Sequence, residues 1–142
     1  GREFTPAEYH LCRSDTTNEE MYQVMELLLQ EIANVVDDSN ATLVVALAPS
    51  IVQVRDELWN TFVEGYPSDE VSFNRTLPNE RLIKMATDNQ WNIVDLYPKL
   101  HFESNHDNEV YNTYEQHWNV EGNKQVGDVI SKFITEQVLI NE

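Results

Sequence analysis

The residues best suited to acid–base chemistry lie late in the chain, in the segment from Glu115 to Asn119. A histidine can act as a general base, and a carboxylate beside it can fix its tautomer and stabilise the imidazolium. Glu115 stands two residues before His117, which allows this pairing where the loop curls. The catalytic candidates are therefore His117 as base and Glu115 as the group that orients it. The structural alternative is a histidine that only caps or packs at a helix start.

Metal binding is a second candidate chemistry, because histidines and acidic residues gather in one polar stretch that holds His101, His106, Asp107, Glu115 and His117. Such groups are common ligands of zinc and other divalent ions. None of their spacings matches a motif such as HExxH, and Cys12 is the only cysteine, so there is no CxxC pair. We therefore expect no metal site and no cofactor. We expect these side chains in a long polar loop from Leu100 to Glu115.

In many hydrolases a histidine–carboxylate pair activates a serine nucleophile. Ser50 follows an apolar run, at Ala48-Pro49-Ser50, where a strand gives way to a helix. It lacks the flanking glycines of a nucleophile elbow, and serine is a favoured helix N-cap. We therefore predict that Ser50 caps a helix and is not the nucleophile.

The elements that must position these groups are indicated by the hydrophobic pattern. Two continuous apolar runs, residues 42–48 and 91–96, predict strands covered on both faces, as in a parallel sheet. Apolar spacings of three and four predict helices at about residues 18–36, 51–62, 78–88 and 120–139. The first helix is amphipathic, and its apolar side carries Met21, Val24, Met25, Leu28, Ile32 and Val35. The alternation predicts an α/β fold with parallel strands, and a sheet of two strands predicts completion by further sequence or by a partner.

The run from Glu115 to Ile130, EQHWNVEGNKQVGDVI, resembles the C-terminal motif of the SGNH/GDSL hydrolase superfamily. In the branch that it resembles, the motif has the form Asp-x-His-Trp-Asn-x-x-Gly. This branch includes proteins similar to the alginate acetylation enzymes. His117, Trp118, Asn119 and Gly122 match, and Glu115 stands where that branch has Asp. The runs TLVVALAPSIVQV and NIVDLYPKL resemble two of the family's strands with their following turns, so the resemblance covers about residues 18–138.

The resemblance implies a three-layer α/β/α fold with parallel strands, flavodoxin-like and incomplete in this chain. Residues 1–17 are then a lead-in segment, and residues 18–142 are the C-terminal part of the domain. The implied function is that of a bacterial serine esterase, acyl-ester hydrolase or O-acyltransferase, with carbohydrate esters among its substrates. His117 is then the base and Glu115 its orienting group, while Trp118 and Asn119 hold the turn.

The family's Gly-Asp-Ser block, which carries the nucleophile, does not occur in the sequence. We therefore expect the missing N-terminal half upstream, and we expect these 142 residues alone to be inactive on esters. The alternative is a non-catalytic acidic interaction domain that retains the fold.

The charge balance excludes several classes of partner. The chain has 9 Lys and Arg against 25 Asp and Glu, a net charge of -16. Phosphate contacts are made chiefly by Lys and Arg, so we expect no nucleic acid, and the same sign argues against anionic membranes. The free edges of a two-stranded sheet make a homodimer another expected way to complete the fold. The resemblance favours a periplasmic or extracellular location.

Overall fold

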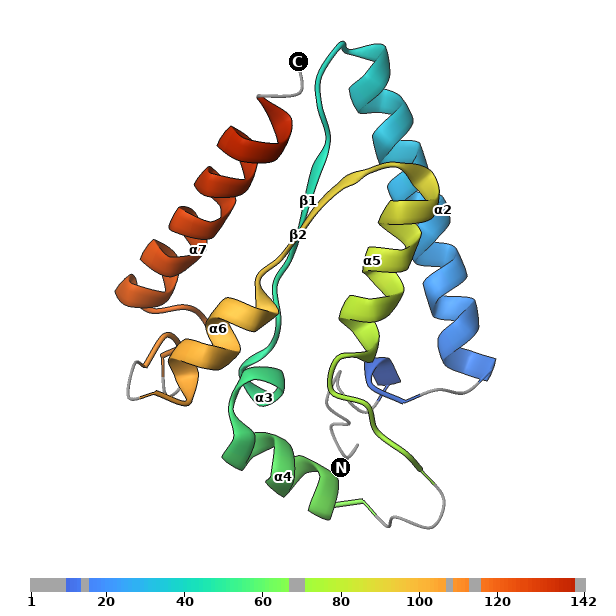
Figure 1. Cartoon of the computed structure of the whole chain (residues 1–142). Coiled ribbons are helices and arrows are strands. Elements are labelled where there is room, and N and C mark those ends of the chain that lie inside the picture. Colours follow the sequence, from blue (N-terminus) through green and yellow to red (C-terminus); the bar gives the residue numbers. More distant parts are fainter. Residues whose placement is uncertain (1–9, 14–15, 67–70, 107–108, 113–115, 140–142) are drawn as a thin grey trace. The chain divides into compact units, whose positions relative to one another are not determined.

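The computed structural model describes residues 10–13, 16–66, 71–106, 109–112 and 116–139 (Figure 1). The chain divides into two compact units. Unit 1 consists of residues 1–43 and 62–91, and unit 2 consists of residues 44–61 and 92–142. Helix α4 (Asp56–Glu64) crosses the boundary between the two ranges.

Unit 2 is built on two parallel strands, β1 (Val44–Leu47) and β2 (Asn92–Asp95). Val44 pairs with Asn92 and Leu47 pairs with Asp95, so the carboxyl ends of both strands lie at the same edge of the sheet. Each strand falls inside one of the two predicted apolar runs and is shorter than it by one or two residues at each end. Helices together with parallel strands confirm the predicted α/β class.

The core of unit 2 lies where the strands meet α3 (Ile51–Val54), α6 (Tyr97–Ser104) and α7 (Val120–Phe133). Half-buried apolar residues of α7 pack against this core, on the side that the helical spacing predicts. A π-helical turn, η1 (Ile134–Val138), follows α7. The buried members of the core are Ile51, Val54, Val94, Leu96, Leu100, Val110, Tyr111 and Val126.

The prediction of a polar loop over residues 100–115 is wrong in its first part, because α6 continues to Ser104. A proline in the first turn presets the helical backbone, and the amide of Tyr97 donates to Asp95 Oδ1 at 3.0 Å. Leu100 and Glu103 are buried, so packing adds to the local signals that stabilise this helix. The metal candidate His101 therefore lies on a helix.

The predicted helix over residues 51–62 is interrupted at Arg55, which adopts an extended backbone with φ -96° and ψ 119°. The interruption separates α3 from α4. At the other end of α3 the capping interaction is reciprocal: Ser50 Oγ accepts from the amide of Gln53, and the Gln53 side chain accepts from the amide of Ser50. The prediction that Ser50 is a helix N-cap is confirmed.

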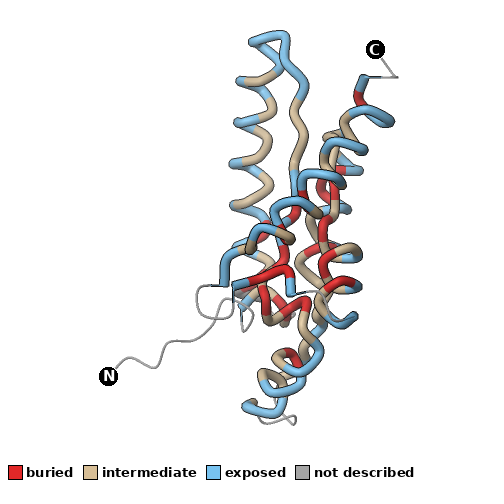
Figure 2. Tube along the Cα trace, turned by 90° about the vertical axis from the view of Figure 1, so that its left-hand side faces the viewer, coloured by how far each residue is buried: buried red, intermediate tan, exposed pale blue. Residues whose placement is uncertain are grey.

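Unit 1 is a pair of helices, α2 (Thr16–Asp38) and α5 (Leu77–Asn89). Arg81 donates to both carboxylate oxygens of Glu19, and its guanidinium lies over the Tyr22 ring at 5.6 Å from the centroid. Further along the pair, Asn89 Nδ2 donates to Glu26 Oε1 at 2.9 Å. α2 is exposed or half-buried over most of its length (Figure 2). None of the helices that the structure describes is both long and apolar enough to span a membrane.

Candidate functional site

The candidate base, His117, lies in the turn that leads into α7. Asn119 is the N-cap of this helix, and its Oδ1 accepts from the amide of Gly122 at 2.9 Å. The side-chain amide of Asn119 also donates to the backbone oxygen of Glu109. One asparagine thus satisfies a free amide of α7 and fastens the helix start to the preceding segment.

A short antiparallel ladder fixes the backbone from His117 to Asn119. The amide of Asn112 donates to the His117 carbonyl at 2.7 Å, and the amide of Asn119 donates to the Val110 carbonyl at 3.1 Å. Between these bonds, Tyr111 and Trp118 form an antiparallel bridge. Because residues 110–112 hold residues 117–119 by main-chain bonds, the position of the His117 backbone is set within unit 2 itself. We call this arrangement the His117 ladder.

Tyr111 connects the His117 ladder to the end of β1. Its hydroxyl donates to the Pro49 carbonyl at 2.7 Å, and Pro49 follows β1 by two residues. Tyr111 is buried, and burial raises the pKa of its hydroxyl to about 12, against a smaller lowering by a side-chain hydrogen bond with Trp118. The hydroxyl therefore stays protonated as a donor throughout the neutral range. It brings the ladder beside the carboxyl edge of the sheet, where α/β proteins collect ligand-binding loops.

Gly122 occupies a position that leaves no room for a side chain. A Cβ built on it would overlap the Val110 carbonyl oxygen and lie 3.1 Å from Trp118 Cβ. Among the described glycines none has a positive φ, so Gly122 is explained by close approach and not by backbone conformation. Gly122 thus permits a tight contact between α7 and the ladder.

His117 is exposed to solvent, whereas Trp118 is half-buried and packs against the core. The residue before His117 carries backbone strain: Gln116 has φ 54°, in the left-handed region that disfavours residues with a Cβ. Glu115 lies outside the described residues, so its pairing with His117 stays a prediction. The arrangement can offer an accessible imidazole on a fixed backbone.

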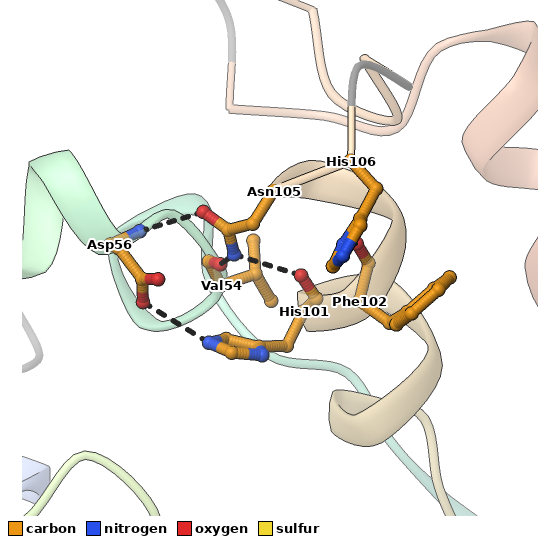
Figure 3. A network of polar contacts seen from close by, with 6 residues as sticks. All are labelled: Val54, Asp56, His101, Phe102, Asn105 and His106. Carbon is orange, nitrogen blue, oxygen red and sulfur yellow. Dashed lines mark hydrogen bonds and ion pairs between the residues drawn. The ribbon is translucent and has the colours of Figure 1, made fainter.

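A second histidine pairs with a carboxylate elsewhere in unit 2 (Figure 3). His101 Nε2, in the last turn of α6, lies 3.2 Å from Asp56 Oδ1, in the first turn of α4. Beside this pair, Asn105 Nδ2 donates to the carbonyls of Val54 and His101, both at 2.8 Å, and its Oδ1 accepts from the amide of Asp56 at 3.2 Å. These bonds fasten the end of α6 to the break between α3 and α4, which is a structural role.

The other metal candidates that the structure describes, His106 and His117, are not part of any group of three ligands. His106 Nδ1 donates to the Phe102 carbonyl at 2.8 Å, and the His106 ring stacks on that of Phe102. Within the described part of the chain no three His, Cys, Asp or Glu residues are grouped as metal ligands. Asp107 and Glu115 lie outside that part.

Residues that sequence reasoning missed are Tyr111, Asn105 and Asp56. Tyr111 and Asn105 lie in what was predicted as a polar loop, and Asp56 meets His101 across 45 positions of sequence. A proline at the second position of α6 was the local signal for that helix. Contacts between distant segments carry no comparable signal in a single sequence.

The chain matches no protein-family model. Comparisons with curated proteins and with solved structures likewise find no significant match. A functional assignment therefore rests on the geometry of the His117 ladder and on the resemblance carried by the chain's own residues.

Proposed function

We propose that this chain is the C-terminal part of an SGNH-hydrolase-like domain of three-layer α/β/α architecture. The proposed reaction is cleavage or transfer of an ester acyl group, with carbohydrate esters as one substrate class. The observation that carries the proposal is the His117 ladder: the backbone of His117 is held beside the carboxyl end of β1 while the residue itself is exposed. The proposal is supported by the place of the motif His-Trp-Asn-x-x-Gly: its first three residues belong to the ladder, and Gly122 is in close contact with it.

The proposed roles come from the chemistry of acyl transfer. A serine oxygen attacks the acyl carbon, and His117 takes the serine proton as general base. When the ester C–O bond breaks, His117 gives that proton to the departing alcohol, and an acyl-enzyme remains. Water or an acceptor hydroxyl then attacks the acyl-enzyme with His117 as base, and His117 returns the proton to the serine oxygen as the acyl group leaves. Glu115 orients the imidazole, and Asn119, Trp118 and Gly122 keep the turn in place.

In this proposal the nucleophile comes from outside these 142 residues, since the sequence has no Gly-Asp-Ser block and Ser50 is engaged as a helix cap. The test is therefore made on the longest translated product of the same reading frame. It should contain Gly-Asp-Ser upstream and hydrolyse p-nitrophenyl acetate, and His117→Ala should lower kcat/KM by about 10²–10⁴-fold. His106→Ala is the matched control, since the His106 side chain stacks on Phe102 and makes none of the ladder bonds.

Two outcomes would overturn the proposal. Hydrolysis by the long product that survives His117→Ala would show that another base does the chemistry. A long product without Gly-Asp-Ser and without turnover would favour the second candidate, a non-catalytic acidic interaction domain. A specific observation favours that candidate: the acidic helix α2 exposes its apolar side.

A further inference from the structure

The apolar side of α2 is exposed. Within this α2 stripe Met21 is 41% exposed, Leu28 60% and Val35 66%. At 3.6 residues per turn its members fall within roughly 100° of the helix circumference. The stripe consists of Met21, Val24, Met25, Leu28, Ile32 and Val35.

The packing partner of α2 within unit 1 uses a different face. α5 contacts α2 through Glu19, Tyr22 and Glu26, which are bound by Arg81 and Asn89. On a helical wheel these positions point roughly 100° or more away from the centre of the α2 stripe. α2 thus has one side used by α5 and a second apolar side that α5 leaves open.

The open side of α2 carries a groove. Glu20, Met21, Val24, Met25 and Leu28 line an open groove of about 450 Å³. Methionine side chains are flexible and polarizable, so a groove with two of them adapts to different apolar partners. Helix-in-groove recognition uses this kind of surface, with apolar anchors one and two turns apart.

The charge of α2 decides which partner fits. The helix contains six acidic residues and no Lys, Arg or His. Glu20, Glu31 and Asp38 fall on one flank of the stripe by helical spacing. Asp37 and Asp38 also lie at the C-terminal end of α2, where the helix dipole is already negative and the last turn has no basic residue. A partner that carries positive charge along this flank and at the C-terminal end of α2 would therefore complement the surface.

A second copy does not supply this positive charge. In an antiparallel pair of α2 helices the same flank of both copies meets, so Glu20 of one copy would lie near Asp38 of the other, and like charges would come together. In a parallel pair the acidic flank would face the opposite flank of the other copy, and α2 has no Lys, Arg or His to place there. The net charge of -16 on the chain adds to this repulsion at longer range.

We propose that the α2 stripe is a docking surface for a basic amphipathic helix of another protein. The apolar face of that helix lies in the groove, and its Lys or Arg residues run along the flank of Glu20, Glu31 and Asp38. The docking surface is independent of the proposed ester chemistry, because α2 belongs to unit 1 and His117 to unit 2. Loss of either function leaves the other testable.

The probe is a short, labelled peptide of leucine and lysine at helical spacing, followed by fluorescence anisotropy. It should bind the chain, and the double change Val24→Gln and Leu28→Gln should weaken binding about tenfold or more. Ile83→Gln is the matched control: Ile83 is an apolar residue of α5, 37% exposed, and lies outside the α2 stripe and its acidic flank. It should change binding less than about twofold, and circular dichroism should show that all variants keep their helix content.

Peptide chemistry provides the charge test. A peptide with glutamate in place of lysine should not bind, and added salt should weaken the lysine peptide. Absence of binding by the leucine–lysine peptide would overturn the proposal. So would equal losses in the Ile83→Gln and stripe variants, because binding would then be general attraction to an acidic surface.

Methionine oxidation tests whether the stripe is open in solution. Met21 should react with peroxide much faster than Met85, which is 8% exposed, and the peptide should protect Met21. Equal protection of both methionines in the free chain would mean that the chain itself covers the stripe, and this would overturn the proposal. Sedimentation completes the test: a dimer that the stripe variant abolishes would identify a second copy as the occupant and overturn the proposal as well.

Discussion

Replacing Gly122 by alanine should destabilise unit 2, although alanine is the better helix former. The new methyl group would overlap the Val110 carbonyl oxygen, and Val110 is only 1% exposed. α7 must therefore move away from the His117 ladder. That movement stretches the 3.1 Å bond from the Asn119 amide to Val110 and disturbs the contact with Trp118.

The magnitude is the balance of opposing contributions. Inserting a methyl group into a filled space costs about 1–3 kcal/mol, and a weakened buried hydrogen bond adds about 1 kcal/mol. Higher helix propensity returns about 1 kcal/mol. The net loss for Gly122→Ala is then about 2 kcal/mol. Gly127→Ala is the matched control on the same helix: no atom lies within 4 Å of its Cβ position, so this change should stabilise by about 1 kcal/mol.

Urea unfolding followed by far-UV circular dichroism measures the two variants against the parent chain. Because the chain has two units, amide hydrogen exchange in α7 is the local readout. Exchange in α7 should become faster in Gly122→Ala and slower in Gly127→Ala. Gly122→Ala at least as stable as Gly127→Ala would refute the close contact between α7 and the ladder, and with it the account of why glycine is required there.

Three further variants test the same unit. Tyr111→Phe should cost about 0.5–1.5 kcal/mol at neutral pH by removing the bond to Pro49. Burial raises the pKa of Tyr111 to about 12, so between pH 10 and 12 the phenol ionises in the unfolded chain before it ionises in the folded one. The parent chain should therefore lose stability over this pH range. Urea titrations of Tyr111→Phe should show no loss from this residue. Asn105→Ala should lower the free energy of unfolding by about 1–3 kcal/mol, because Asn105 joins the end of α6 to Val54 and Asp56. If hydrogen exchange leaves the end of α6 as protected as before, Asn105 does not hold this end in place. Gln116→Gly should stabilise by about 1 kcal/mol in thermal unfolding, because glycine adopts a φ of 54° without a Cβ clash; a loss would mean that the Gln116 side chain makes a stronger contact than the strain it bears.

Local signals in the sequence predicted the local structure well. Continuous apolar runs marked β1 and β2, because a strand buried on both faces tolerates few polar residues. A serine directly after an apolar run marked the start of α3, where the structure shows Ser50 in a reciprocal capping box with Gln53. The spacing of apolar residues marked α7.

Features that depend on distant contacts were not predictable in the same way. α6 is short and polar, and the burial of Leu100 and Glu103 that supports it depends on packing against other elements. The clamp of Asn105 on Val54 joins positions 51 residues apart. The His117 segment was identified as a candidate by its residue types and its resemblance, but the ladder with residues 110–112 was not, since its bonds are made by main-chain groups of any residue type.

The ladder also decides which variants can separate chemistry from folding in unit 2. A sheet of two strands with four residues each gives little stability on its own, so the contacts of α6, α7 and the ladder must supply most of it. Substitutions at Tyr111, Asn119 or Gly122 therefore change stability and the position of His117 together. His117 differs from them because it contributes its backbone carbonyl to the ladder, and alanine retains that carbonyl. A loss of turnover in His117→Ala at unchanged stability would consequently report on the imidazole, whereas the same loss in Gly122→Ala would report on the fold.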